Sequence, residues 1–99
     1  MSKVWVPCKI GDRMFPGEAS IFLVTSDGRE LSMFIQENSS NFLRGGSVDS
    51  GWISGFALTP SRDGHSVLVR LCKETLEGVL YAFFSEFALR VEDEDVEKQ

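Results

Sequence analysis

The fold is decided by residues 19–36, whose sequence is ASIFLVTSDGRELSMFIQ. Asp27 and Gly28 lie at the centre of this segment, and an Asp-Gly pair favours a tight hairpin turn because glycine adopts positive φ at no steric cost. On the second arm, apolar residues alternate with polar ones; they are Leu31, Met33 and Ile35. A period of two is typical of a half-buried strand, so the segment predicts a β-hairpin with arms at residues 19–25 and 30–36.

A second hairpin is predicted between residues 51–59 and 66–72, which flank another Asp-Gly pair at Asp63 and Gly64. We expect its inward face to carry large apolar side chains from both arms. They are Trp52, Phe56 and Leu58 on the first arm, and Val67, Val69 and Leu71 on the second. Two hairpins are therefore predicted at the centre of the fold.

The segments outside the hairpins are shorter or more polar. Residues 4–10 predict one further strand, which is followed by a loop at residues 11–17. Residues 37–49 are polar and contain a Gly-Gly pair. We expect them to form a loop that is pinned to the body by Phe42 and Leu43.

The last third of the chain fits two kinds of secondary structure. Apolar residues recur at helical spacing between Leu76 and Val91, but a second set that includes Tyr81 and Phe83 fits strict alternation. A strand that starts near Val79 is favoured, because it would cover the otherwise open edge of the strand at residues 66–72. Helix is the alternative for residues 76–91.

The sequence therefore predicts a mainly β fold, a small antiparallel barrel or sandwich of five to six strands. Residues 81–89, YAFFSEFAL, resemble the closing turn of SH3-like barrels, so this resemblance implies an SH3-like barrel as one form of the fold. With a helix at residues 76–91, the prediction becomes an α+β fold in which one C-terminal helix packs on a four- or five-stranded antiparallel sheet.

Charge divides the chain into a body and a tail. Residues 1–91 hold ten acidic and nine basic residues and carry −1, whereas residues 92–99 hold five acidic residues and one basic residue and carry −4. We expect a single β-rich domain over residues 1–91, followed by an acidic, disordered tail. A near-neutral body offers no broad basic surface for phosphate groups, so a nucleic-acid partner is not expected.

Cys8 and Cys72 are the two cysteines of the chain, and we expect them to be small apolar side chains rather than a disulfide. The first residues contain no apolar run of signal-peptide length. No stretch of the sequence reaches the roughly 18 consecutive apolar residues that span a bilayer. These features predict a cytoplasmic protein without a membrane partner.

Few residues are candidates for chemistry. His65 is the single histidine, and the sequence has no Cys-x-x-Cys pair and no phosphate-binding loop. We therefore expect no enzyme activity, no metal and no cofactor. Glu18 and Glu86 have apolar neighbours, so these two carboxylates and His65 are the candidates for a ligand site.

Four arginines fall in predicted turns and would form an anion site if those turns met; they are Arg13, Arg29, Arg44 and Arg62.

Three functions stay open at this point. The first is a non-enzymatic interaction or accessory module that binds a protein partner or a second copy through loop aromatics, for which Phe15, Phe42 and Trp52 are the candidates. The second is a small ligand-binding protein or enzyme that uses a carboxylate at the mouth of the barrel. The third is an acidic inhibitor of a basic partner, which would act through the tail.

Overall fold

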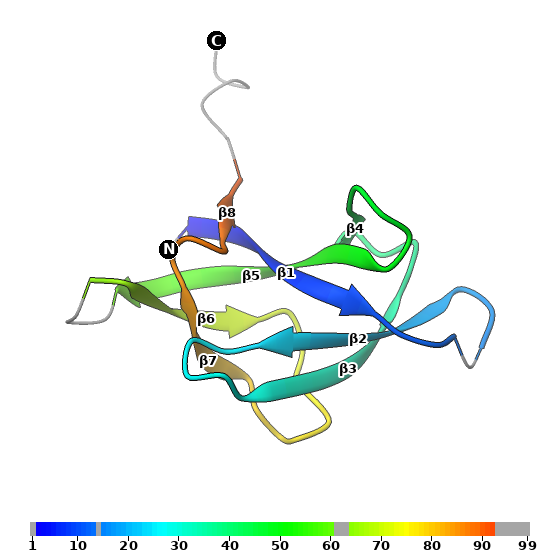
Figure 1. Cartoon of the computed structure of the whole chain (residues 1–99), viewed down its shortest axis with the longest axis horizontal. Coiled ribbons are helices and arrows are strands. Elements are labelled where there is room, and N and C mark those ends of the chain that lie inside the picture. The colour runs from blue at the N-terminus through cyan, green and yellow to red at the C-terminus, as the bar shows by residue number, and fades with distance from the viewer. Residues whose placement is uncertain (1, 14, 61–63, 93–99) are drawn as a thin grey trace, which may run out of the picture.

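Eight β-strands form one antiparallel sheet in the computed structural model, which describes residues 2–13, 15–60 and 64–92 (Figure 1). The strands are β1 (Ser2–Ile10), β2 (Glu18–Val24), β3 (Glu30–Gln36), β4 (Phe42–Arg44), β5 (Ser50–Pro60), β6 (Ser66–Leu71), β7 (Tyr81–Ser85) and β8 (Arg90–Val91). None of the described residues is helical, so the predicted mainly β fold is confirmed and the α+β alternative is wrong. It follows that no described segment is a helix long and apolar enough to cross a bilayer.

The number of strands exceeds the expected five to six because two short strands pair along longer ones. β4 lies within the segment that was expected to be a loop, and it pairs with β5. β8 pairs with β1 at Val4 and Trp5. Both short strands extend the sheet without changing its overall order.

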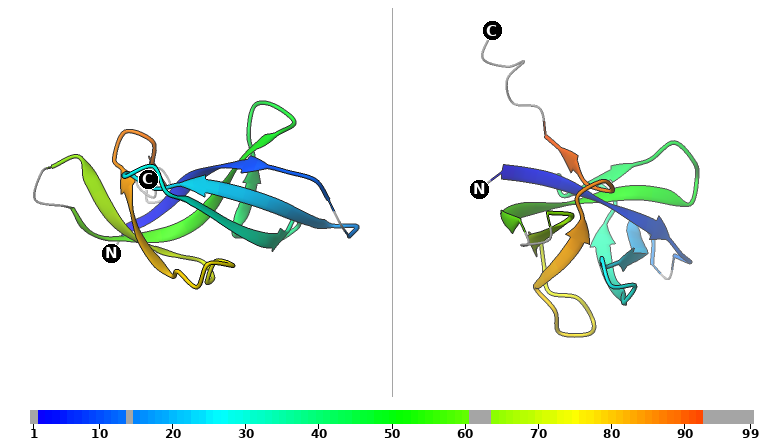
Figure 2. Two further views of the ribbon diagram at one scale, coloured as in Figure 1. Left: turned by 60° about the horizontal axis from the view of Figure 1, so that its bottom comes forward. Right: turned by 60° about the vertical axis from the view of Figure 1, so that its left-hand side comes forward.

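Both predicted hairpins form, and β1 joins them into one curled sheet. The strand order is β3-β2-β1-β5-β6-β7. β1 pairs with β5 from Ser2 to Lys9, but it reaches β2 only at Lys9 and Ile10. The result is a half-barrel in which the β2–β3 hairpin lies across from β6 and β7 (Figure 2).

The edge of β1 that faces away from β5 is shared by two strands, with β8 near its start and β2 near its end. Pro7 lies between them. Ile10 donates its N–H to the carbonyl of Asp49 on the β5 side at 2.8 Å, so the alternation of antiparallel pairing points the backbone of Pro7 to the other edge. Because proline has no N–H, this uncovered stretch of edge has no unpaired donor.

The core lies on the inner face of the half-barrel. On β2 and β3 buried side chains alternate with outward ones, as predicted. The buried cluster consists of Val4, Val6, Cys8, Ala19, Ile21, Leu23, Leu31, Met33, Ile35, Phe42, Ile53, Val69, Leu71, Ala82 and Phe84. It is continuous across both hairpins, so removal of this apolar surface from water holds the two halves of the sheet together.

The inward face of β5 differs from the prediction. Ile53 is buried in the core, whereas Phe56 is 43% exposed on the outer face. Glycines occupy the inward positions 51 and 55, and a Cβ at Gly55 would lie 2.7 Å from Cγ1 of Val69. The expected face was wrong because side chains of neighbouring strands, rather than those of β5, fill the space above these glycines.

On β7, the alternating set that includes Tyr81 and Phe83 lies on the outer face of the sheet. Ala82 and Phe84 are buried, whereas Tyr81 and Phe83 point outward. Both sets of alternating residues contain aromatic side chains. Period two therefore identifies the strand but not the face that is buried.

Two parts of the prediction fall on residues outside the described ones: Asp63 of the second turn and the expected tail at residues 93–99. Glu92, which was assigned to the tail, belongs to the folded body. Its N–H donates to the carbonyl of Lys3 at 3.1 Å, and its carboxylate accepts a hydrogen bond from Nε1 of Trp5 at 3.2 Å. The body therefore continues at least one residue beyond β8.

Candidate functional site

β3 and β7 lie at the two ends of the strand order, so the half-barrel is open between them. In antiparallel pairing, the backbone groups of alternate residues point away from the partner strand. Leu71 donates its N–H to the carbonyl of Leu80 at 2.8 Å, which sets this alternation for the pairing of β6 with β7. Tyr81 and Phe83 therefore direct their N–H and C=O groups toward the opening.

The β3 side of the opening is covered by the connection between β6 and β7. The N–H of Leu76 donates to the carbonyl of Ser32 at 2.8 Å, and Nζ of Lys73 donates to the carbonyl of Phe34 at 2.8 Å. The carboxylate of Glu77 accepts hydrogen bonds from the N–H of Ser32 at 2.9 Å and from its hydroxyl at 2.6 Å. The hydroxyl bond, followed by the backbone bond, holds the pKa of Glu77 below its ordinary value. The edge of β3 is therefore occupied.

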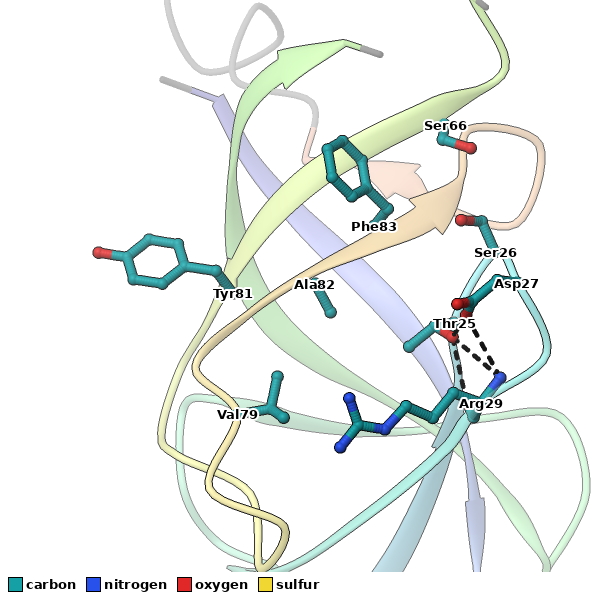
Figure 3. Close-up of a pocket in the computed structure, with 9 residues that line it drawn as sticks. All are labelled: Thr25, Ser26, Asp27, Arg29, Ser66, Val79, Tyr81, Ala82 and Phe83. Atoms are coloured by element: carbon teal, nitrogen blue, oxygen red, sulfur yellow. Dashed lines mark hydrogen bonds between the residues drawn. The ribbon is translucent and has the colours of Figure 1, made fainter.

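The β7 side of the opening is bridged at Phe83, whose carbonyl accepts a hydrogen bond from the N–H of Ser26 at 2.8 Å. Beside this bridge, an open groove of about 410 Å³ separates β7 from the β2–β3 turn (Figure 3). We call it the turn groove. Its lining residues are Thr25, Ser26, Asp27, Arg29, Ser66, Val79, Tyr81, Ala82 and Phe83.

Hydrogen bonds within the β2–β3 turn build one wall of the turn groove. Gly28 has a φ of 88°, which the tight turn requires. Thr25 donates its N–H to the carbonyl of Arg29 at 2.9 Å, and its hydroxyl donates to the carboxylate of Asp27. The hydroxyl bond is the main cause that lowers the pKa of Asp27, and the backbone N–H of Arg29 adds to it. The carboxylate of Asp27 is therefore engaged in the turn.

Arg29 supplies the positive charge of the turn groove. Its side chain extends along the groove toward Val79 (Figure 3). Its guanidinium forms no ion pair with any part of the chain that the structure describes. A guanidinium in this position can form two parallel hydrogen bonds to a carboxylate that enters the groove.

Next to the turn groove, the outer surface of the sheet carries exposed aromatic side chains. The register places Phe56 opposite Arg70, Arg70 opposite Tyr81, and Leu68 opposite Phe83. We call these five residues the aromatic face. Its aromatic side chains are between 43% and 51% exposed. Tyr81 and Phe83 belong to both features, since their backbones line the groove and their side chains lie on the face.

The three aromatics predicted to bind a partner do not form one surface. Phe42 is 4% exposed, so its expected display on a loop is wrong. Its ring packs over Gly51, where a Cβ would lie 3.0 Å from a ring carbon. Phe15 is exposed on the loop before β2, and Trp52 is half-buried on the outer side of the sheet with the guanidinium of Arg90 5.9 Å from its ring.

Two of the three predicted ligand-site residues meet. Nδ1 of His65 lies 3.7 Å from a carboxylate oxygen of Glu86, and the ring of His65 stacks on Phe87 with 5.8 Å between centroids. Both side chains of this contact are well exposed, and neither lines the turn groove. Glu18 is the first residue of β2, and the start of β2 lies at the opposite end of the molecule from the start of β6 (Figure 1). The structure therefore does not unite the three groups at one barrel mouth.

The arginines of the predicted turns also separate. Arg13 and Arg44 both form ion pairs with Glu37, whereas Arg29 faces the turn groove, and Arg62 lies outside the described residues. Arg29 was expected in an anion site with the other turn arginines, and it lies instead beside β7. Tyr81 carried a usable signal, since its hydroxyl needs water or a partner and so favours the outward face.

Both cysteines are free thiols. Burial, with a further contribution from Cys72, raises the pKa of Cys8 to about 12. Burial also raises the pKa of Cys72. Across residues 2–13, 15–60 and 64–92, no group of three or more His, Cys, Asp or Glu side chains is arranged to hold a metal ion.

Comparisons of the chain with protein-family models, with curated proteins and with solved structures find no match.

Proposed function

We propose that this protein is a non-enzymatic interaction module that binds another protein through the aromatic face. The observation that carries the proposal is the row of Phe56, Arg70 and Tyr81 across β5, β6 and β7. Adjoining exposed apolar side chains commonly mark protein interfaces. Tyrosine and arginine are among the residues that contribute most to binding energy there. The proposal thus replaces the loop aromatics expected from the sequence with aromatics on strands.

A different protein fits the aromatic face better than a second copy. Arg70 is the charged residue of the face, and none of its five residues is acidic. In a two-fold dimer the same patch meets itself, so two Arg70 guanidiniums would be brought together. A partner with a carboxylate opposite Arg70 avoids this repulsion.

A protein also fits the face better than nucleic acid. Lys3 lies opposite Phe56 and adds a second cation, but its ammonium is 3.6 Å from the carboxylate of Glu92. Single-stranded nucleic acid binds where several cations follow the phosphate backbone. The chain carries a net charge of −5, which opposes such binding.

The proposal keeps the cytoplasm as the place of action. Cys8 and Cys72 are free thiols, a state that a reducing compartment preserves.

The test is affinity capture from the native lysate with three chains: wild type, Phe56→Ser and Phe15→Ser. Phe15 is the matched control because it is exposed but lies outside the aromatic face. We expect a protein that is retained by wild type and by Phe15→Ser and lost with Phe56→Ser. A captured protein whose retention is the same for all three chains would contradict the proposal.

Two solution measurements separate the rival partners. Light scattering after size exclusion is expected to show an 11.1 kDa monomer, and a dimer that Phe56→Ser dissociates would replace the partner protein by a second copy. Fluorescence anisotropy with a labelled single-stranded oligonucleotide is expected to show no binding. Salt-sensitive binding that Arg70→Ala abolishes would overturn the assignment to a protein.

A further inference from the structure

We infer that the partner contributes an extended peptide segment, which pairs with the outer edge of β7 in the turn groove and places an acidic side chain against Arg29. This inference rests on the proposed function and specifies the part of the partner that binds. It follows from three features of the groove: its backbone groups, its shape and its charge.

The backbone groups at the β7 edge are available for pairing. Tyr81 directs its N–H and C=O away from β6, and neither group forms a hydrogen bond with any described residue. Phe83 adds its N–H, while its carbonyl is bonded to Ser26. Three consecutive backbone groups of this kind match the spacing of an added strand, and addition of a peptide strand to an exposed sheet edge is a recurrent mode of recognition.

The shape of the groove selects a single segment. The wall built by Thr25, Asp27 and Arg29 stands opposite β7 (Figure 3). The bridge between Ser26 and Phe83 joins this turn to β7 beside the groove. The edge strand of a second copy is attached to the rest of its sheet, which would collide with this wall. A single extended peptide has no attached sheet and can enter the groove. The edge of β3 offers no equivalent site, because the connection before β7 already covers it.

The charge of the groove selects the side chains of the segment. Arg29 forms no ion pair with the described residues, and Asp27, the acidic residue of the lining, is held by the hydroxyl of Thr25. An acidic side chain is therefore complementary to the groove. Val79 and Ala82 form an apolar part of the lining, which suits a small apolar residue at a neighbouring position of the peptide.

The side chains on the other face of the added strand would lie beside Tyr81 and Phe83. Cross-strand neighbours of aromatic residues on one face of a sheet stabilise the pairing, and aromatic or β-branched residues do so best. The added strand thus extends the aromatic face, so that a single partner segment uses the backbone edge and the face together.

The experiment is selection from a displayed library of random linear peptides against the full chain. Enriched peptides are expected to share Asp or Glu at one fixed position. Arg29→Glu should weaken their binding by about tenfold or more, since a charge-assisted pair is lost. Arg29→Lys should restore part of the affinity. Lys9→Glu is the matched control, because Lys9 is exposed and forms no ion pair within the described residues, and it should leave binding unchanged.

Amide hydrogen exchange tests the backbone pairing directly. The bound peptide is expected to slow exchange at Tyr81 and Phe83, while the amide of Met33, already paired within the sheet, stays unchanged. Enriched peptides that bind equally well to Arg29→Glu, or that leave exchange at Tyr81 and Phe83 unaltered, would overturn the inference.

The capture experiment separates this inference from the proposed function. If the captured partner is lost with Phe56→Ser and kept with Arg29→Glu, the proposed function stands and the edge-pairing inference fails. A partner that neither variant affects overturns both.

Discussion

Glu77 and Ser32, 45 residues apart in the sequence, are joined by two hydrogen bonds in which the carboxylate accepts the N–H at 2.9 Å and the hydroxyl at 2.6 Å of the same serine. The contact closes the exposed edge of β3, a position where open backbone groups would invite pairing with other chains. Because the edge of β3 is covered, the open backbone groups between the two ends of the sheet lie on β7, where the candidate site is.

Replacement of Glu77 by Ala is expected to lower the free energy of unfolding at pH 7, because Ser32 loses both acceptors. The pKa of Glu77 is lower in the folded state than its ordinary value of 4.5, so its stabilising contribution is present above that value and is lost as the pH falls through the folded-state pKa. Urea unfolding of wild type and Glu77→Ala at pH 7 and pH 3 measures this. The difference between them should shrink at pH 3.

Glu74→Ala is the control for this prediction, since Glu74 lies in the same connection and is exposed. It should unfold like wild type at both pH values. Equal destabilisation by the two substitutions, or a Glu77→Ala effect that does not depend on pH, would contradict the role assigned to the contact.

Phe84→Ala and Phe83→Ala test the assignment of the two faces of β7. Phe84 is 2% exposed and Phe83 is 43% exposed. Truncation of the buried ring is expected to cost about 3–5 kcal/mol. Truncation of the outward ring should cost less than about 1.5 kcal/mol. Chemical denaturation followed by far-ultraviolet circular dichroism measures both, and a larger loss for Phe83→Ala would show that the faces are reversed.

Gly55→Ala is expected to destabilise the sheet by about 1–3 kcal/mol, as overpacking of a core does. Its new Cβ would lie 2.7 Å from Cγ1 of Val69 and 2.8 Å from the carbonyl oxygen of Arg70. Gly46→Ala is the matched control, because a Cβ there meets nothing within 4 Å. Thermal unfolding should place the Gly46→Ala midpoint at or slightly above that of wild type. Similar midpoints for the two variants would rule out the close approach of β5 and β6.

Cys8 is expected to resist alkylation in the folded protein. The thiolate is the reactive form, and burial raises the pKa of Cys8 to about 12, so little thiolate is present at pH 8. Iodoacetamide labelling followed by peptide mass spectrometry should show slow modification of Cys8 in buffer and rapid modification in urea. Rapid labelling of Cys8 without denaturant would mean that the C-terminal part of β1 is less buried than in the structure.

Glu92 shows how a contact that is distant in sequence can anchor a residue of an acidic run. Glu92 begins an acidic run, and a like-charge run normally marks a solvated terminus. In the fold, the same residue bonds to the backbone of Lys3 and to the indole of Trp5. The amino-acid composition shows only that Glu92 is charged. Whether its carboxylate is held in place depends on Trp5, which is 87 residues away in the sequence.

The two hairpins could be predicted from the order of the amino acids. Asp27-Gly28 and Gly64 mark turns in which glycine has positive φ, and period two on β3 selects its buried side chains. These signals are local, because they depend on the backbone preference of one residue and on the alternation of the pleat. A strand in the last third followed from the need to cover the edge of β6.

Contacts between distant parts of the chain set which face of β5 and β7 is buried and where the candidate site lies. The inward glycines of β5 are covered by Val69 and Phe42, which come from other strands, and the turn groove exists because Ser26 meets Phe83 across the opening of the half-barrel. Such contacts join residues far apart in the chain. Their energies depend on the curl of the whole sheet, which no local pattern of residues encodes.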